Sequence, residues 1–266
     1  PSGVGKTELA KVLAREVFGS EDALLKIDMS EFAERHSLSR LLGAPAGYVG
    51  YDDGAKLTDA IRRRPYQVVL FDEIEKADGD VYNILLQLLE DGYLTDSRGQ
   101  KVSFKNTIVI LTSNLGTEQI TERNNKRSYG FGQGAESAVD TKKLAIEALD
   151  RFMPIELINR FDDVVVFNQL ATSDARQIVD LMLKDLEKRL QTKNLTLKIS
   201  PSTKKMLLEK GFSDKKGARL LRRTIEEQIE DQIAEALLAD KIQAGDQIKL
   251  AVKKGQLELE TYAPVK

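Results

Sequence analysis

The first seven residues constrain the fold of this chain more than any other segment. They read Pro-Ser-Gly-Val-Gly-Lys-Thr, the second part of the phosphate-binding pattern G-x-x-x-x-G-K-[ST]. In that pattern a glycine-rich loop leads into a helix, and its backbone N–H groups surround phosphate oxygens. We therefore expect Gly3, Val4 and Gly5 to cradle phosphates. Lys6 would reach the β- and γ-phosphates, and the Thr7 hydroxyl would bind Mg²⁺.

The pattern is incomplete at its start. Its first glycine would stand just before Pro1, and the buried strand that normally precedes such a loop would lie further upstream. Because residue 1 is a proline and no leader sequence is recognisable, we expect a fragment of a longer protein, truncated inside its nucleotide site. The alternative, a glycine-rich turn with a surface lysine, is disfavoured because a helix starts where the motif requires one.

Composition limits both the fold and the function. With 266 residues, 41% of them hydrophobic, the chain can bury the core of one large domain or two modest ones. The net charge of −2 argues against a protein that mainly neutralises nucleic-acid phosphates. There is no cysteine, which excludes thiolate zinc sites and cysteine nucleophiles. The only histidine is His36, which excludes any Ser-His-Asp triad that would use another histidine. No apolar run approaches the roughly 18 residues of a membrane span.

A pair of acids follows a buried strand. Residues 68–71 form a continuous apolar run, typical of a parallel strand that is covered on both faces. Asp72 and Glu73 come directly after it, at the end of the strand where ligands of open α/β sheets bind. We expect Asp72 to hold Mg²⁺ and Glu73 to polarise a water molecule toward the γ-phosphate. Taken alone, the two acids could instead cap the next helix.

Two further segments carry candidate functional residues. Residues 112–114 end another apolar strand, and Asn114 could orient the attacking water, although a turn-forming asparagine is the alternative. In residues 43–51, Tyr48 and Val49 stand between glycines, where they are difficult to bury. An exposed aromatic on a glycine-rich loop suggests contact with a partner, and the alternative is a loop folded back over the core.

Strands alternate with helices in the first part of the chain, which predicts a parallel, three-layer α/β sheet. The expected strands are residues 23–29, 68–71 and 107–111. The expected helices cover residues 9–17 up to Gly19, residues 30–40, residues 56–64 and residues 81–90 up to Gly92, with a hairpin at residues 93–104.

The composition changes after residue 120. Residues 121–140 are polar and lack apolar periodicity, so we expect a surface loop there, then a helix from residue 141 and a last buried strand at residues 164–167. We place the domain boundary near Gln169, which gives domains at 1–169 and 170–266. In the second domain we expect helices at 173–191, from Ser200-Pro201 and at 219–240, with short strands at 195–199, 247–252 and 257–262. One apolar stripe is formed by Leu221, Ile225, Ile229, Ile233 and Leu237.

Four segments together resemble a known family. Residues 43–54, Asp72-Glu73-Ile74-Glu75-Lys76-Ala77, Leu94-Thr95-Asp96 and Gly217-Ala218-Arg219 are similar to the second AAA+ module of the Clp unfoldases, of ClpC or ClpB type. The resemblance covers essentially the whole chain. It implies an α/β fold with a P-loop, a three-layer α/β/α large domain, and a small, mainly helical domain with a short β extension.

The resemblance also implies roles for individual residues. In the nucleotide site, Lys6 and Thr7 match Walker A, and Asp72 and Glu73 match Walker B. Asn114 matches sensor 1, and Arg219 matches sensor 2. Arg160 matches the arginine finger that reaches a neighbouring subunit's ATP. Tyr48, with Val49 beside it, matches the pore-loop aromatic that grips a translocating polypeptide. Such modules form homo-hexameric rings that use ATP and Mg²⁺ to thread unfolded or tagged proteins through an axial channel, in some cases with adaptor proteins.

A tripeptide in the polar segment bears on the partner. Tyr129-Gly130-Phe131 resembles the docking tripeptide of proteins that bind a ClpP-type peptidase, with Tyr129 where Ile, Leu or Val is usual. An exposed Phe131 could enter an apolar pocket on a partner, and the alternative is an incidental Gly-Phe in a flexible loop.

We therefore expect an ATP-dependent protein unfoldase that feeds a ClpP-type peptidase. The alternative within the same family is a ClpB-like disaggregase that acts without a peptidase. A nucleic-acid-remodelling AAA+ protein would carry basic pore residues in place of Tyr48 and Val49, and an inactive nucleotide-binding scaffold would not need Glu73 and Asn114. We expect no nucleic-acid or membrane partner, and a location in the bacterial cytosol or in the stroma or matrix of a bacterially derived organelle.

Overall fold

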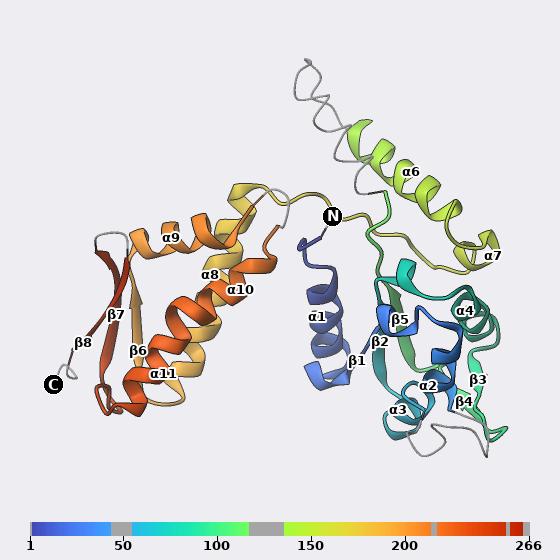
Figure 1. The fold of residues 1–266 in the computed structure, drawn as a ribbon, viewed down its shortest axis with the longest axis horizontal. Helices are drawn as coiled ribbons and strands as arrows, with labels where there is room; N and C mark the ends of the chain where they lie inside the picture. Colours follow the sequence, from blue (N-terminus) through green and yellow to red (C-terminus); the bar gives the residue numbers. More distant parts are fainter. Residues whose placement is uncertain (1, 44–54, 117–135, 214–216, 254–255, 263–266) are drawn as a thin grey trace. The chain divides into compact units, whose positions relative to one another are not determined.

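The computed structural model describes residues 2–43, 55–116, 136–213, 217–253 and 256–262 (Figure 1). The chain divides into two compact units. The first is Gly5–Val166, and the second is Phe167–Lys266 together with Pro1–Val4.

A three-stranded parallel sheet forms the centre of the first unit. Its strands, in the order β1-β2-β5, are β1 (Leu24–Asp28), β2 (Gln67–Asp72) and β5 (Thr107–Leu111). The strand boundaries confirm the three expected strands to within one residue. The side chains of β2 from Gln67 to Phe71 are all buried, as expected for a parallel strand covered on both faces.

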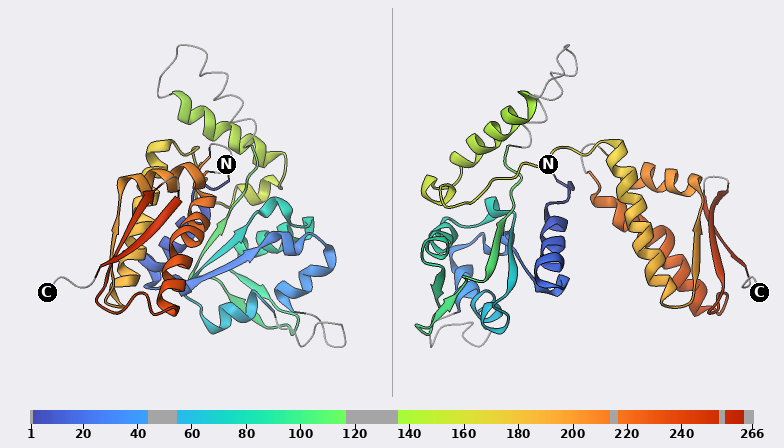
Figure 2. Two further views of the ribbon diagram at one scale, coloured as in Figure 1. Left: turned by 60° about the vertical axis from the view of Figure 1, so that its left-hand side comes forward. Right: turned by 180° about the vertical axis from the view of Figure 1, so that it is seen from behind.

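The two faces of the sheet are covered by different helices (Figure 2). On one face, Val68 and Leu70 pack with Ala10 and Ala14 of α1 (Lys6–Phe18). On the other face, Val69 and Phe71 belong to a larger core that includes Val81, Tyr82, Leu85 and Leu88 of α4 (Gly79–Asp91). Successive strand residues point to opposite faces, so one strand serves both cores. The expected three-layer α/β/α arrangement is confirmed.

Short elements connect the layers of this unit. They are η1 (Glu21–Ala23), η2 (Met29–Phe32), η3 (Arg35–Leu38), α2 (Ser39–Leu42), α3 (Thr58–Arg63), η5 (Ile74–Lys76) and the antiparallel pair β3 (Tyr93–Thr95) and β4 (Lys101–Ser103). The single helix expected after Met29 is therefore wrong, because two 3-10 turns occupy most of that stretch before α2. Gly19 and Gly92 end α1 and α4 in the left-handed conformation, as expected from their positions.

Two predictions for residues 136–167 are wrong. Helix α6 (Glu136–Asp150) begins five residues before the expected helix start at residue 141, and α7 (Ile155–Ile158) follows it. Residues 121–135 of the expected loop lie outside the described residues. Residues 164–167 form no strand, and the Val165 side chain is 65% exposed. This apolar run lies where the chain passes from the first unit to the second, and it joins no sheet among the described strands.

The second unit is mainly helical with a small sheet. Its helices are α8 (Thr172–Gln191), α9 (Pro201–Gly211), α10 (Arg219–Ile225) and α11 (Asp231–Leu238), with a π-helical turn at Glu226–Glu230 between the last two. The sheet has the order β6-β7-β8, formed by β6 (Thr196–Ile199), β7 (Gln247–Lys253) and β8 (Gln256–Tyr262). Strand β6 pairs with β7 in parallel, and β8 pairs with β7 in antiparallel fashion.

The apolar stripe of the last helical segment is confirmed as core. Leu221, Ile225, Ile229 and Ile233 are buried and pack with residues of α8, α9 and the small sheet, whereas Leu237 is only partly buried. Ser200 caps α9 by accepting a hydrogen bond from the Thr203 amide, which confirms the Ser-Pro helix start.

Candidate active site

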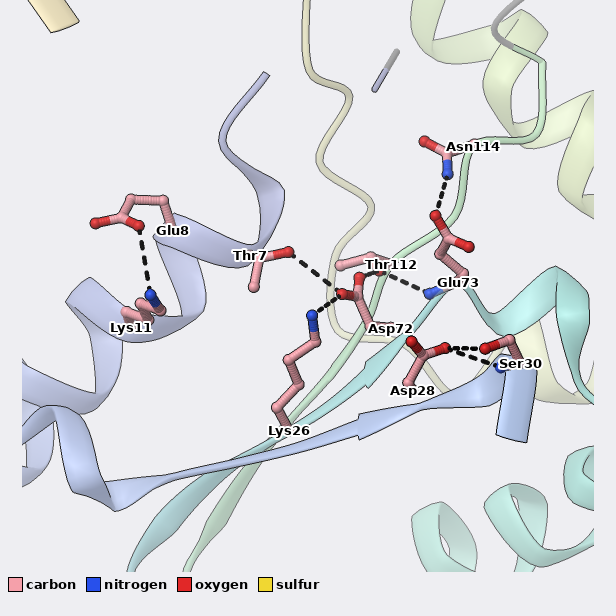
Figure 3. A network of polar contacts seen from close by, with 10 residues as sticks. All are labelled: Thr7, Glu8, Lys11, Lys26, Asp28, Ser30, Asp72, Glu73, Thr112 and Asn114. Atoms are coloured by element: carbon pink, nitrogen blue, oxygen red, sulfur yellow. Dashed lines mark hydrogen bonds and ion pairs between the residues drawn. The ribbon is translucent and has the colours of Figure 1, made fainter. Parts of the chain in front are cut away.

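Polar side chains gather at the carboxyl ends of β2 and β5 (Figure 3). These strands are adjacent and parallel, so Asp72 at the end of β2 and the residues after Leu111 at the end of β5 meet at one edge of the sheet. Helix α1 begins with Lys6 and Thr7 beside this edge. The fold thus brings three sequence-distant segments together at the position where α/β sheets bind ligands.

The backbone at the start of α1 has a geometry that suits an anion. Gly3 and Gly5 have positive φ angles of 70° and 101°, a conformation that side chains with a Cβ rarely adopt. Gly5 is the N-cap residue of α1, and no side chain caps the first turn. The first N–H groups of a helix have no intrahelical acceptor, so they can donate to phosphate oxygens. The backbone geometry therefore fits the predicted phosphate loop.

Lys6 is held at the end of β5. Its Nζ donates to the Ser113 carbonyl oxygen at 2.6 Å and to Oδ1 of Asn114 at 2.6 Å. Burial lowers the pKa of Lys6 below its ordinary value, and the nearby carboxylates of Glu75, Asp72 and Glu73 oppose this shift. Three acids close to one half-buried ammonium group make a site of mixed charge, in which a phosphate could compete for Lys6.

Asp72 is the most highly connected acid of the site. It accepts hydrogen bonds from Thr7 Oγ1 at 3.4 Å and from Thr112, and Lys26 Nζ lies 2.6 Å from Oδ2. Burial alone would raise the pKa of Asp72, but the bonds from Lys26, Thr112 and Thr7 lower it below its ordinary value. The carboxylate is therefore ionised at neutral pH. Sequence analysis missed the contacts of Asp72 with Lys26 and Thr112, because Lys26 lies on β1 and Thr112 follows β5.

Thr7 and Asp72 offer a donor set that suits Mg²⁺. A hydroxyl and an ionised carboxylate, 3.4 Å apart, are hard oxygen ligands of the kind that magnesium prefers. No group of three or more His, Asp or Glu side chains that could hold a metal occurs within the described part of the chain. A magnesium ion held here would take its remaining ligands from water and from nucleotide phosphates, as is usual for this ion.

Glu73 has an unusual backbone conformation. Its φ of 57° and ψ of 54° lie in the left-handed region, which is uncommon for a long side chain. The Glu73 amide donates to Thr112 Oγ1 at 3.1 Å, and the Asn114 side-chain amide donates to Oε1 of Glu73 at 3.3 Å (Figure 3). Such strain costs about 1–3 kcal/mol and persists where surrounding contacts impose it. This conformation directs the Glu73 side chain to Asn114, whereas the adjacent Asp72 side chain contacts Thr7 and Lys26.

Glu75 is a further acid that sequence analysis did not single out. The short turn η5 brings it under the residues after β5, where its Oε1 accepts the Asn114 backbone N–H at 3.0 Å. The only sequence signal would have been its spacing of two residues from Glu73, which places it on the same turn.

The remaining candidate residues lie elsewhere. Arg160 follows α7, and its guanidinium forms an ion pair with Glu90 of α4. Arg219 is the first residue of α10 in the second unit, and its side chain is exposed. Tyr48 and Val49, and likewise Tyr129-Gly130-Phe131, lie outside the described residues.

The two ends of the segment that contains Tyr48 are well anchored. On one side, the Ser97 amide donates to the Leu42 carbonyl oxygen at 3.1 Å. On the other side, the Ala55 amide donates to Oδ2 of Asp59 at 2.9 Å. Arg62 pairs with both Asp59 and the buried Asp96 of the β3–β4 turn. These contacts connect the flanks of residues 44–54 to the hairpin.

Comparison with protein families gives two matches. The family described as AAA domain (Cdc48 subfamily) matches residues 1–164, and the C-terminal, D2-small domain of ClpB protein matches residues 170–250.

No described helix is long and apolar enough to cross a membrane.

Curated relatives and solved structures agree with these families. The chain is 47% identical to the chaperone protein ClpB of Helicobacter hepaticus over 97% of its length, and 46% identical to the negative regulator of genetic competence ClpC/MecB of Bacillus subtilis over 99%. It spans 28% and 32% of these two relatives. A closed-state cryo-EM structure of Hsp104 with ATPγS and FITC casein matches with a TM-score of 0.78 and 38% identity, over 97% of this chain and 43% of that one.

Proposed function

We propose that this chain, which belongs to the AAA domain family in the group that contains the Clp chaperones, is an ATPase. It would bind and hydrolyse ATP at the edge of the β1-β2-β5 sheet. The observation that carries the proposal is the convergence of Lys6, Asp72, Glu73 and Asn114 in one network of contacts. A cation, two acids with different surroundings and an amide are the groups that phosphoryl transfer to water requires.

Each residue has a distinct part in this chemistry. The uncapped start of α1 and the Lys6 ammonium bind the phosphates and compensate their charge. Thr7 and Asp72 would hold Mg²⁺, which neutralises charge on the phosphates. Glu73 orients a water molecule and accepts its proton, and the Asn114 amide keeps the Glu73 carboxylate in place through its hydrogen bond.

We further propose that hydrolysis drives protein unfolding. Relatives named as Clp chaperones and a structure of Hsp104 with casein support this function. In this proposal the chain works in a homo-hexamer, Tyr48 and Val49 grip the substrate, Arg160 reaches a neighbour's nucleotide and Arg219 acts as sensor 2. An exposed guanidinium such as Arg160, held by a surface ion pair, is free to exchange partners on assembly. The bacterial and chloroplastic relatives support a cytosolic or stromal location.

The identity of the downstream partner divides the proposal into two versions. One relative is named a Clp protease ATP-binding subunit and another is named ClpB, at 44% and 47% identity. Phe131, in the tripeptide Tyr129-Gly130-Phe131, supports a ClpP-type peptidase as the partner. To separate the versions, the full-length protein is given its cognate ClpP, ATP and a fluorescent substrate, with Phe131→Ala as the variant. Loss of degradation with retained unfolding supports docking, whereas unfolding without degradation in both proteins favours a disaggregase.

ATP hydrolysis is tested with Glu73→Gln in the full-length, assembled protein. The glutamine keeps the shape and the hydrogen bond from Asn114 but is not a base, so we expect nucleotide binding to be retained and kcat to fall by about a hundredfold or more. Glu8→Gln, on the exposed side of α1, is the matched control and should leave kcat unchanged. A Glu73→Gln variant with near-normal turnover would refute the assigned role.

A further inference from the structure

One acid near the proposed active site contacts the backbone of Asn114. Glu75 lies on the turn η5, and its Oε1 accepts the backbone N–H of Asn114 at 3.0 Å. Its second oxygen, Oε2, is buried and has no hydrogen-bond partner among the residues that the structure describes. Burying a carboxylate oxygen without a hydrogen-bond partner costs free energy. We therefore expect this side chain to perform a function in its buried position.

The segment Ser113–Asn114 is the point where the site's contacts meet. The Ser113 carbonyl oxygen and the Asn114 side-chain oxygen each accept from Lys6 at 2.6 Å. The Asn114 side-chain nitrogen donates to Glu73 at 3.3 Å. The side chain of Asn114 bridges Lys6 and Glu73, so the position of its backbone affects both contacts at once. The Asn114 backbone N–H donates to Glu75, which ties this backbone to the turn η5.

The turn that carries Glu75 is itself firmly held. The Ile74 amide donates to the Thr112 carbonyl oxygen at 2.9 Å, which ties the turn to the end of β5. Tyr82 of α4 donates its hydroxyl to the Ile74 carbonyl oxygen at 3.2 Å in the buried core. Burial, together with the Glu75 charge, raises the pKa of Tyr82 to about 12, so this hydroxyl remains a donor at neutral pH. The turn that carries Glu75 is therefore held both by the end of β5 and by α4.

We propose that Glu75 is a positioning residue for ATP hydrolysis, which fixes the Asn114 backbone so that the Asn114 side chain contacts Glu73 and Lys6 together. This inference rests on the proposed ATPase function and deepens it. Glu75 acts through Asn114 and needs no contact with the nucleotide. The role depends on an oxygen acceptor at Oε1 rather than on the negative charge.

A charge effect is the main competing explanation. Glu75 is also the acid with the strongest influence on Lys6, so its removal could alter phosphate binding directly. The two explanations differ in one respect. Glu75→Gln keeps an oxygen acceptor for the Asn114 amide but removes the charge, whereas Glu75→Ala removes both.

The test uses the full-length, assembled protein with four variants: Glu75→Gln, Glu75→Ala, Asn114→Ala and the double variant Glu75→Ala with Asn114→Ala. Lys76→Ala, at the exposed next position, is the control and should behave as wild type. We expect Glu75→Ala to lower kcat by about tenfold with nucleotide affinity nearly unchanged, and Glu75→Gln to keep most of the activity. In the double variant, loss of Glu75 should add no further decrease, because both residues act as one unit.

A second measurement is independent of catalysis. Amide hydrogen exchange at Asn114 reports the bond to Glu75 directly, and it should become faster in Glu75→Ala but not in Glu75→Gln. If the wild type hydrolyses no ATP, the proposed function fails while this exchange measurement still decides the role of Glu75. The inference is overturned if exchange at Asn114 is unchanged in Glu75→Ala, if Glu75→Gln loses as much kcat as Glu75→Ala, or if the effects in the double variant multiply.

Discussion

At the carboxyl edge of the β1-β2-β5 sheet, polar side chains contact one another, whereas in the second unit the contacts that hold the helices together are apolar. The Asp72 carboxylate contacts one lysine and two threonines. In the second unit, Leu221 and Ile229 are completely buried among other apolar residues. Polar contacts of this kind fix geometry but add little net stability, because each replaces a contact with water. Apolar burial supplies the stability and specifies orientation less sharply.

Backbone strain separates the two regions as well. The described residues include three non-glycine residues with positive φ, namely Glu73 at the sheet edge and Asn194 and Asp240 in turns of the second unit. Asn and Asp tolerate this conformation because their short side chains bond locally, whereas Glu has no such advantage. Under the proposed function, the strain at Glu73 lies at a catalytic position, whereas at Asp240 it lies in an ordinary turn.

The largest effect on stability is expected in the apolar core of the second unit. Leu221→Ala should lower the free energy of unfolding by about 2–5 kcal/mol, because it leaves a cavity in a fully buried position. Leu238→Ala is the matched control, since that side chain is 87% exposed and should change stability little. Chemical denaturation of both variants tests this; equal losses would contradict the assignment of Leu221 to the core.

A buried polar contact of the first unit should have the next largest effect. Asp96→Asn removes the charge that pairs with Arg62 and should cost about 1–3 kcal/mol at neutral pH. Burial alone would raise the pKa of Asp96, but Arg62 and the Gln100 and Arg98 amides lower it. Asp96 therefore stabilises the fold above its unfolded pKa of about 3.9, and this contribution disappears as the pH falls through the lower folded value.

The measurement for Asp96 is a series of denaturation curves between neutral and acid pH. The difference between wild type and Asp96→Asn should be constant near neutrality and shrink as the solution becomes more acidic than about pH 4. A difference that grows toward acid pH would mean that Asp96 is protonated more readily in the folded protein, contrary to its contacts.

A smaller effect, of opposite sign, is expected from relieving strain. Glu73→Gly should raise the free energy of unfolding by about 0.5–1 kcal/mol while abolishing ATP hydrolysis, because glycine adopts positive φ without strain. Asp240→Gly should stabilise less and leave hydrolysis unchanged. Thermal unfolding and ATPase rates of both variants provide the comparison. If Glu73→Gly is destabilised, the contacts with Asn114 and Thr112 outweigh the strain.

The smallest effect is expected for an exposed ion pair. Arg189 of α8 contacts both oxygens of Glu230 at 3.1 and 2.6 Å, and most of the Arg189 side chain is exposed. Arg189→Gln should change stability by less than about 0.5 kcal/mol, since water and salt screen such pairs. Denaturation at low and high salt tests this, and a large salt-dependent loss would show that the second unit depends on charge.

Local patterns predicted the elements whose causes are local. The apolar run of residues 68–71 identified β2, and Gly19 and Gly92 marked helix ends, because each signal lies within the element itself. Residues 164–167 carry the same kind of run as β2 but pair with none of the described strands, and only the tertiary structure decides this.

The same reasoning explains which site residues were found. Lys6, Asp72 and Glu73 belong to short motifs, and Asn114 ends a recognisable strand. Lys26 contacts Asp72 at the end of the neighbouring strand, and Glu75 contacts Asn114 in the segment after β5, so neither residue has a local signature. Contacts across parallel strands depend on register, which one sequence does not reveal.

The π-helical turn at Glu226–Glu230 has a geometric consequence for the stripe that includes Leu221, Ile225, Ile229 and Ile233. Residues spaced by four advance about 40° beyond a full turn in a regular α-helix, so a long run with this spacing would wind away from the core. A wider turn rotates less per residue and compensates for this drift. The π-helical turn therefore keeps the apolar residues before and after it on the same side of the helix. If residues 226–230 adopted regular α-helical geometry with no residue removed, the chain beyond them would turn further about the helix axis, and the buried side of α11 would move toward water.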